Sequence, residues 1–105
     1  MAEDQVELTV VTMEMEAVDA ARLGALLARY VVLTRQAPGC RNVDLCASAT
    51  APGRFLVIEK WEDAASQRAH FDATETVTLA ESCRGLLTRA PTIDLFAGIS
   101  AHDLR

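Results

Sequence analysis

Apolar and polar residues follow two different periods along the chain, one typical of strands and one of helices. Residues 6–15 are rich in β-branched and apolar side chains, which favours a strand. Residues 41–49 alternate between apolar and polar positions, and residues 54–62 form a further apolar run. Because only residues 50–53, which include the turn signal Ala51-Pro52-Gly53, stand between these two, the pattern predicts an antiparallel hairpin. A fourth strand is expected over residues 92–98.

In the two long segments between these strands, apolar residues recur at intervals typical of helices. A first helix is expected over residues 19–36, with Asp19 as its N-cap and Pro38-Gly39 after its end. Its apolar face is made by Leu23, Leu26, Leu27, Tyr30, Val31 and Thr34. The second segment predicts two helices, over residues 63–72 and 75–88. We therefore expect a helical layer built from both segments.

The order of elements predicts an α+β fold of the ferredoxin-like type. Strand, helix, hairpin, helix and strand make a βαββαβ arrangement, and right-handed crossovers place both helical segments on one face of a four-stranded antiparallel sheet. A length of 105 residues suits one domain. We take residues 1–105 as that domain, with a core over about residues 6–98 and a tail over residues 99–105.

Both faces of the predicted sheet carry apolar side chains. Alternation places Val6, Leu8 and Val10 opposite Val11, Met13 and Met15, and it places Phe55, Val57 and Trp61 opposite Leu56 and Ile58. One chain supplies helices for only one face. The pattern therefore predicts a homodimer formed through the sheet face away from the helices.

Composition narrows the possible functions. The net charge is -5 and the basic residues are scattered singly, so no basic patch for nucleic acid is expected. The three cysteines, Cys40, Cys46 and Cys83, form neither a disulfide framework nor a zinc motif. The N-terminus lacks the basic and apolar parts of a signal peptide, and no apolar run is long enough to cross a membrane. We expect a cytoplasmic protein that contacts no membrane.

Three motifs carry a resemblance to a known family. The first is Thr34-Arg-Gln-Ala-Pro-Gly-Cys40, the second is Phe55-Leu-Val-Ile-Glu-Lys-Trp-Glu-Asp63, and the third is His70-Phe71. In this order they resemble the antibiotic biosynthesis monooxygenase family, which has a Pro-Gly after a long helix, a strand ending in Glu-x-Trp and a His about nine residues later. The resemblance covers about residues 6–98 and implies a dimeric α+β barrel.

The resemblance implies an enzyme that needs no cofactor. Such a monooxygenase oxidises a small polycyclic aromatic of the phenol or anthrone type with O₂, because the deprotonated substrate itself supplies electrons to oxygen. The candidate catalytic residues are Glu59, Trp61 and His70. The indole offers a stacking surface at an apolar pocket, and His70 would remove a proton from the substrate. We expect Trp61 and His70 to border one pocket.

Other functions remain open. A haem-binding or haem-degrading member would use His70 as the axial ligand and Trp61 against the macrocycle. The haem-degrading members also use an Asn in the first strand, where this chain has residues 9–12, Thr-Val-Val-Thr. A non-catalytic dimeric protein that binds small molecules is the third reading. The non-catalytic alternatives for the three residues are a core or interface anchor for Trp61, a bond to neighbouring backbone or an Arg for Glu59, and a half-exposed packing residue for His70.

Overall fold

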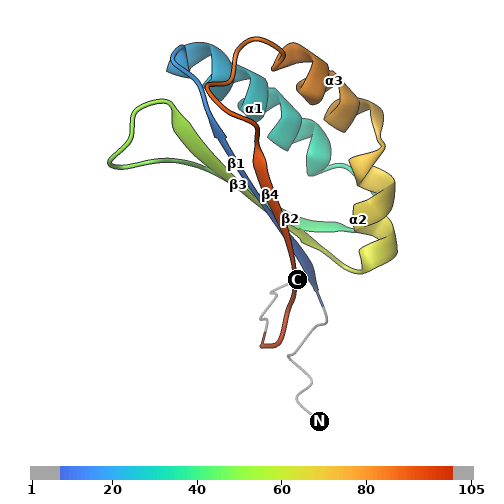
Figure 1. The fold of residues 1–105 in the computed structure, drawn as a ribbon. Coiled ribbons are helices and arrows are strands. Elements are labelled where there is room, and N and C mark those ends of the chain that lie inside the picture. The colour runs from blue at the N-terminus through green and yellow to red at the C-terminus, as the bar shows by residue number, and fades with distance from the viewer. Residues whose placement is uncertain (1–7, 101–105) are drawn as a thin grey trace.

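The protein folds as a single four-stranded sheet covered by helices. The computed structural model describes residues 8–100 (Figure 1). Strand β1 (Thr9–Glu16) lies inside the sheet between β3 (Arg54–Trp61) and β4 (Thr92–Ala97), and β2 (Cys40–Ala47) pairs with the far side of β3. The order is β2-β3-β1-β4, and every pair is antiparallel. The predicted α+β ferredoxin-like arrangement is confirmed.

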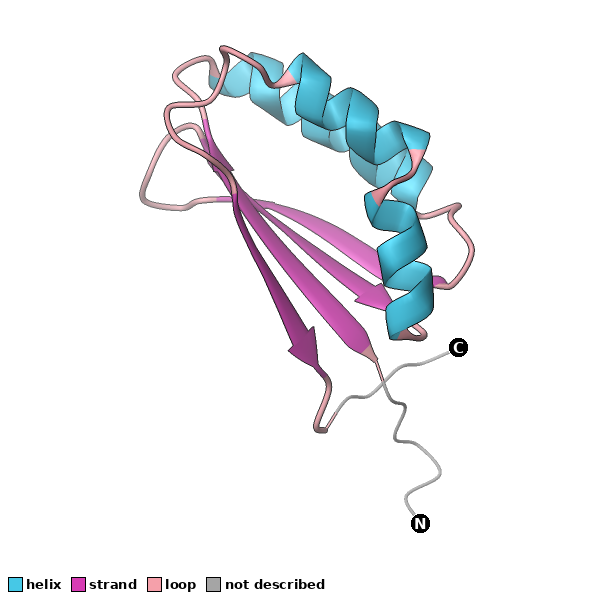
Figure 2. Cartoon of the chain, turned by 45° about the vertical axis from the view of Figure 1, so that its right-hand side comes forward, coloured by secondary structure: helices cyan, strands magenta, loops and turns pink. Residues whose placement is uncertain are grey.

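Three helices cover one face of this sheet. Helices α1 (Ala20–Thr34), α2 (Ala64–Phe71) and α3 (Thr74–Ser82) lie on the same side of the strands (Figure 2). Both predicted N-caps are confirmed. The Asp19 carboxylate accepts from the Arg22 amide at 3.0 Å, and the Asp63 carboxylate accepts from the Ser66 amide at 2.7 Å.

The last helix is shorter than the sequence predicted. Helical spacing suggested a helix to residue 88, but α3 ends at Ser82. Gly85 adopts a φ of 73°, a conformation that other residues avoid and that stops the helix. Leu87 then pairs with Ala17 in an isolated bridge, so the segment after α3 is tied to the end of β1 instead of continuing the helix.

The Pro38-Gly39 turn fixes α2 against the end of α1. Gly39 has a φ of 81°, and an added Cβ would collide with the Ser66 side chain of α2. The Gly39 carbonyl also accepts from the Glu62 amide at 2.8 Å. This turn therefore brings the start of α2 beside the end of α1, and Thr34 of α1 contacts His70 of α2.

The core lies between the sheet and the helices. Leu23 and Leu27 of α1 pack over Val43 and Val57, and all four are almost fully buried. In the register between β1 and β3, Val11 pairs with Glu59. Since paired residues share a face, Glu59 points toward the helices from among apolar core residues.

The outer face of the sheet carries both apolar and charged side chains. Val10, Leu56, Ile58 and Phe96 lie on it and alternate with the core residues of their strands. On the same face Lys60 pairs with Val10, Glu14 with Leu56 and Asp44 with Ile58. Phe96 is 53% exposed in the single chain, and every residue of β4 is exposed. The described strands thus carry apolar side chains on both faces, but the outer face is only partly apolar; Val6 lies outside the described residues. Within residues 8–100, none of the helices is long and apolar enough to cross a membrane.

Candidate functional site

A buried carboxylate, that of Glu59, lies at the centre of the site. Glu59 and Trp61 are two residues apart on β3, so both side chains face the helices. The Glu59 carboxylate accepts from the Tyr30 hydroxyl at 2.6 Å and from the Trp61 indole Nε1 at 3.0 Å. The side chain is only 3% exposed. These two donors satisfy both oxygens of a charge that water does not reach.

The His70 imidazole lies among acceptor oxygens. Its Nε2 is 3.2 Å from Thr34 Oγ1, whose own proton goes to the Tyr30 carbonyl at 2.7 Å. Thr34 is therefore an acceptor toward His70. The same Nε2 lies 3.5 Å from Glu75 Oε2, and Nδ1 lies 3.9 Å from Glu59 Oε1. Nε2 therefore has a hydrogen-bond acceptor in Thr34, whereas Nδ1 is too far from Glu59 for a hydrogen bond and is affected by its charge alone.

Two aromatic rings fix the position of this imidazole. The Trp61 and His70 ring centroids are 4.6 Å apart, and the Tyr30 and His70 centroids are 5.7 Å apart. The rotation of the His70 ring is therefore limited by packing as well as by hydrogen bonding. We refer to Tyr30, Thr34, Glu59, Trp61, His70 and Glu75 as the acid–base cluster.

Burial sets the resting protonation of the cluster. It lowers the pKa of His70 below its usual 6.5, and the charges of Glu59 and Glu75 oppose that shift only in part. Burial and the Glu59 charge raise the pKa of Tyr30, so its phenol stays protonated and keeps donating. His70 is therefore neutral near neutral pH, and the charges of Glu59 and Glu75 would stabilise its protonated form. Such a group is suited to accept a proton from a ligand.

One cavity reaches His70 directly. It has a volume of about 500 Å³ and lies between the Pro38 turn and the end of α2. We call it the His70 cavity; its walls include Pro38, Asp63, Ser66, Ala69, His70 and Glu75. Small side chains dominate these walls.

A larger cavity lies between α3 and the β1–β4 half of the sheet. Its volume is about 570 Å³, and we call it the apolar cavity; its walls include Met13, Met15, Phe71, Val77, Leu79 and Ile93. Thr76 lines it as well and donates to the His70 carbonyl at 2.7 Å. The His70 ring does not form part of its wall.

The structure brings the three predicted residues together but alters their expected roles. Trp61 is 0% exposed, so its indole faces the cluster rather than a cavity. The His70 ring packs against the indole, and the cavity that His70 lines does not include Trp61 in its wall, so a pocket bordered by both residues stays a prediction. Among the residues described, no cluster of His, Cys, Asp or Glu is arranged to hold a metal ion.

Thr34 and Glu75 were missed at the sequence level, and Tyr30 was assigned to the core alone. Tyr30 and Thr34 are four residues apart on one face of α1, a spacing that would have placed them together. The sequence gives no such signal for Glu75. It joins His70 only because α3 turns back over α1 after residues 72–73.

Comparison with known proteins identifies relatives of this fold. The model of the family described as antibiotic biosynthesis monooxygenase matches residues 8–81. No curated protein matches the chain.

Three solved structures illustrate the likeness. Rv0793 from Mycobacterium tuberculosis is 26% identical, with a TM-score of 0.80 over 90% of this chain and 97% of its own. NE2512 from Nitrosomonas europaea, of unknown function, is 20% identical, with a TM-score of 0.85 over 96% and 98%. SnoaB from Streptomyces nogalater, a cofactor-independent oxygenase, is 19% identical, with a TM-score of 0.76 over 90% and 95%. The last two show likeness of fold alone.

Proposed function

This chain belongs to the antibiotic biosynthesis monooxygenase family, and we propose that it is a cofactor-independent monooxygenase that oxidises a phenolic or anthrone-type polycyclic aromatic with O₂. The observation that carries the proposal is His70, a buried imidazole that lines a cavity, with Thr34 and Glu75 near Nε2 and the Glu59 carboxylate 3.9 Å from Nδ1. SnoaB, of the same fold, is a cofactor-independent oxygenase.

The reaction balances without an added cofactor. His70 takes a proton from the acidic carbon or hydroxyl of the substrate, and the resulting anion passes electrons to O₂. Oxygen bonds to the ring carbon as a hydroperoxide. Loss of water then breaks the O–O bond and leaves a carbonyl, so an anthrone and O₂ give a quinone and water. The protein supplies a base, a position and shelter from water.

The three predicted residues divide this work. His70 touches the substrate and is the catalytic residue. The Glu59 carboxylate, 3.9 Å from Nδ1, stabilises the imidazolium that forms. Trp61 donates to Glu59 and packs against the imidazole, so it positions both groups. Glu59 and Trp61 act through His70 and are positioning residues.

We place the substrate in the His70 cavity, and a pair of tryptophan insertions tests this. Ala69 lines the His70 cavity and Ala80 lines the apolar cavity, and both are exposed on helices. Ala69→Trp is expected to reduce oxygen uptake at least about tenfold by filling the site, whereas Ala80→Trp leaves it nearly unchanged. The reverse result would move the substrate to the apolar cavity and would contradict direct contact with His70.

We further propose that the protein is a homodimer through the outer sheet face. The support is the apolar side chains on that face, Leu56, Ile58 and the exposed Phe96, which no helix of the chain covers. Sedimentation equilibrium at micromolar concentration is expected to give twice the chain mass of 11.4 kDa. Ile58→Glu is expected to give a folded monomer. A wild-type protein that sediments as a soluble monomer would refute the argument from the outer face.

The geometry disfavours haem as the native ligand. His70 is 5% exposed, and Thr34 and Glu75 lie at its Nε2, so iron would have to displace them. Titration with haemin is expected to give no stoichiometric Soret shift. A shift that saturates at one haem per chain and disappears in His70→Ala would establish the haem alternative instead.

A further inference from the structure

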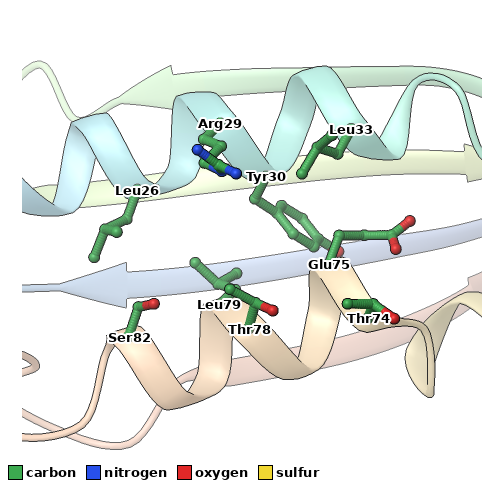
Figure 3. A pocket seen from close by; sticks show the side chains of 9 residues that line it. All are labelled: Leu26, Arg29, Tyr30, Leu33, Thr74, Glu75, Thr78, Leu79 and Ser82. Carbon is green, nitrogen blue, oxygen red and sulfur yellow. The ribbon is translucent and has the colours of Figure 1, made fainter.

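A groove between α1 and α3 has the features of a binding site for a small organic anion. It encloses about 570 Å³, and Figure 3 shows side chains of both helices along it. Its apolar surface comes from Leu26 and Leu33 of α1 and from Leu79 of α3. A volume of this size is in the range of small-molecule sites, and three leucines provide cover for an aromatic body.

One cation stands in this groove without a protein partner. Arg29 lines it from α1 (Figure 3), and no hydrogen bond or ion pair within residues 8–100 engages its guanidinium. The other arginine near the start of this helix, Arg22, does not line the groove. A guanidinium beside an apolar surface pairs well with a carboxylate, because its planar N–H donors match the two carboxylate oxygens.

Hydroxyl-bearing side chains line the opposite wall of the groove. Thr74, Thr78 and Ser82 are spaced four residues apart, so they follow one face of α3 along the groove (Figure 3). Each hydroxyl is able to donate to an anion or accept from a ligand. The groove therefore offers polar groups on both walls beside its leucines.

The far end of the groove carries an acceptor. Glu75 lines it beside Tyr30, and its carboxylate is 20% exposed. Its negative charge repels a carboxylate, so the anionic end of a ligand belongs at Arg29. A hydroxyl donor on the ligand suits the Glu75 end. The Arg29 and Glu75 positions in the groove thus prefer opposite chemical groups.

We propose that this groove binds a hydroxylated aromatic carboxylate. The carboxylate pairs with Arg29, the ring lies on the leucines, and the hydroxyl donates to Glu75. Arg29 and the leucines lie outside the acid–base cluster, so binding of the carboxylate and the ring does not depend on the proposed oxygenase reaction; Glu75 alone is used by both proposals.

Isothermal titration calorimetry with three matched probes tests the proposal. They are 6-hydroxy-2-naphthoate, 2-naphthoate, which lacks the hydroxyl, and 2-naphthol, which lacks the carboxylate. We expect the hydroxynaphthoate to bind one per chain and more tightly than either analogue. Arg29→Gln is expected to weaken it about tenfold or more, to the level of 2-naphthol. Glu75→Gln is expected to reduce the advantage of hydroxynaphthoate over naphthoate.

Two controls keep the result specific. Arg22→Gln changes the charge of the same helix by the same amount and is expected to leave binding unchanged. Ala80→Trp fills the apolar cavity and is also expected to leave it unchanged. The proposal is overturned if hydroxynaphthoate does not bind, if Arg29→Gln binds it as the wild type does, or if Ala80→Trp abolishes binding. The calorimetric test does not measure oxygen uptake, so a failed oxygenase assay would not contradict binding in the groove.

Discussion

Replacing His70 by Ala is expected to lower oxygen uptake with an anthrone substrate by about a hundredfold to ten-thousandfold, the usual contribution of a positioned base. The reason is that the imidazole is the neutral base at the His70 cavity, held by Thr34 and by the Trp61 ring. His70→Asn keeps a polar group at the site and is expected to lose activity to a similar degree. Urea unfolding of both variants separates this loss from a loss of folded protein.

The pH dependence of oxygen uptake tests the role of His70 independently of its substitution. Catalysis requires neutral His70, and burial lowers its pKa below 6.5. Uptake should therefore be constant at neutral pH and fall as the pH drops through that lowered pKa. Glu59 raises the pKa of His70, so Glu59→Gln is expected to move the acidic limb to still lower pH. A merely structural Glu59 would not shift the limb.

A substitution on the same helix provides the control for the His70 variants. Arg68→Ala alters the exposed side of the same helix and should leave uptake unchanged. If uptake survives in His70→Ala with the fold intact, His70 is a packing residue and the base lies elsewhere. If the wild-type protein consumes no oxygen with any anthrone or phenol, the oxygenase proposal fails and a binding protein becomes the better explanation.

Much of the fold was accessible from the sequence because each element has a local signal. Asp19 and Asp63 cap their helices as predicted, and the 51–53 turn joins the predicted hairpin strands. The end of α3 was not accessible. Residues 83–88 carry helical spacing, but the positive φ of Gly85 and the bridge from Leu87 to Ala17 depend on tertiary packing.

The site was accessible only where its residues are close in sequence. Glu59 and Trp61 share a strand face by period two, which the sequence shows. The His70 ring meets them because the Gly39 turn holds α2 beside α1, a contact between distant segments. Two further contacts follow from helix packing: the Tyr30 hydroxyl reaches Glu59, and Glu75 reaches His70. The spacing of residues along the sequence does not predict either of them.

Replacing Glu59 by Leu is expected to have the largest effect on stability of any single change in the cluster. The substitution removes the acceptor of the Tyr30 hydroxyl and of the Trp61 indole, and both donors are buried. A hydrogen bond to a charged group contributes about 1.5–3 kcal/mol, so we expect a loss of about 3–5 kcal/mol in the free energy of unfolding. Urea denaturation measures this, with exposed Glu62→Ala as the control at about 0.5 kcal/mol or less.

A double-mutant cycle with Tyr30→Phe establishes the cause of that loss. Tyr30→Phe alone removes one of the two donors to Glu59 and is expected to cost about 1–2 kcal/mol. The double variant has no Tyr30 hydroxyl that Glu59→Leu could leave without an acceptor. Its loss in the free energy of unfolding should therefore be smaller than the sum of the two single losses by about 1 kcal/mol or more. Strictly additive losses would contradict the coupling through the 2.6 Å contact. A Glu59→Leu protein as stable as the wild type would mean that the desolvation of the carboxylate outweighs its two hydrogen bonds, which would assign Glu59 to function rather than to folding.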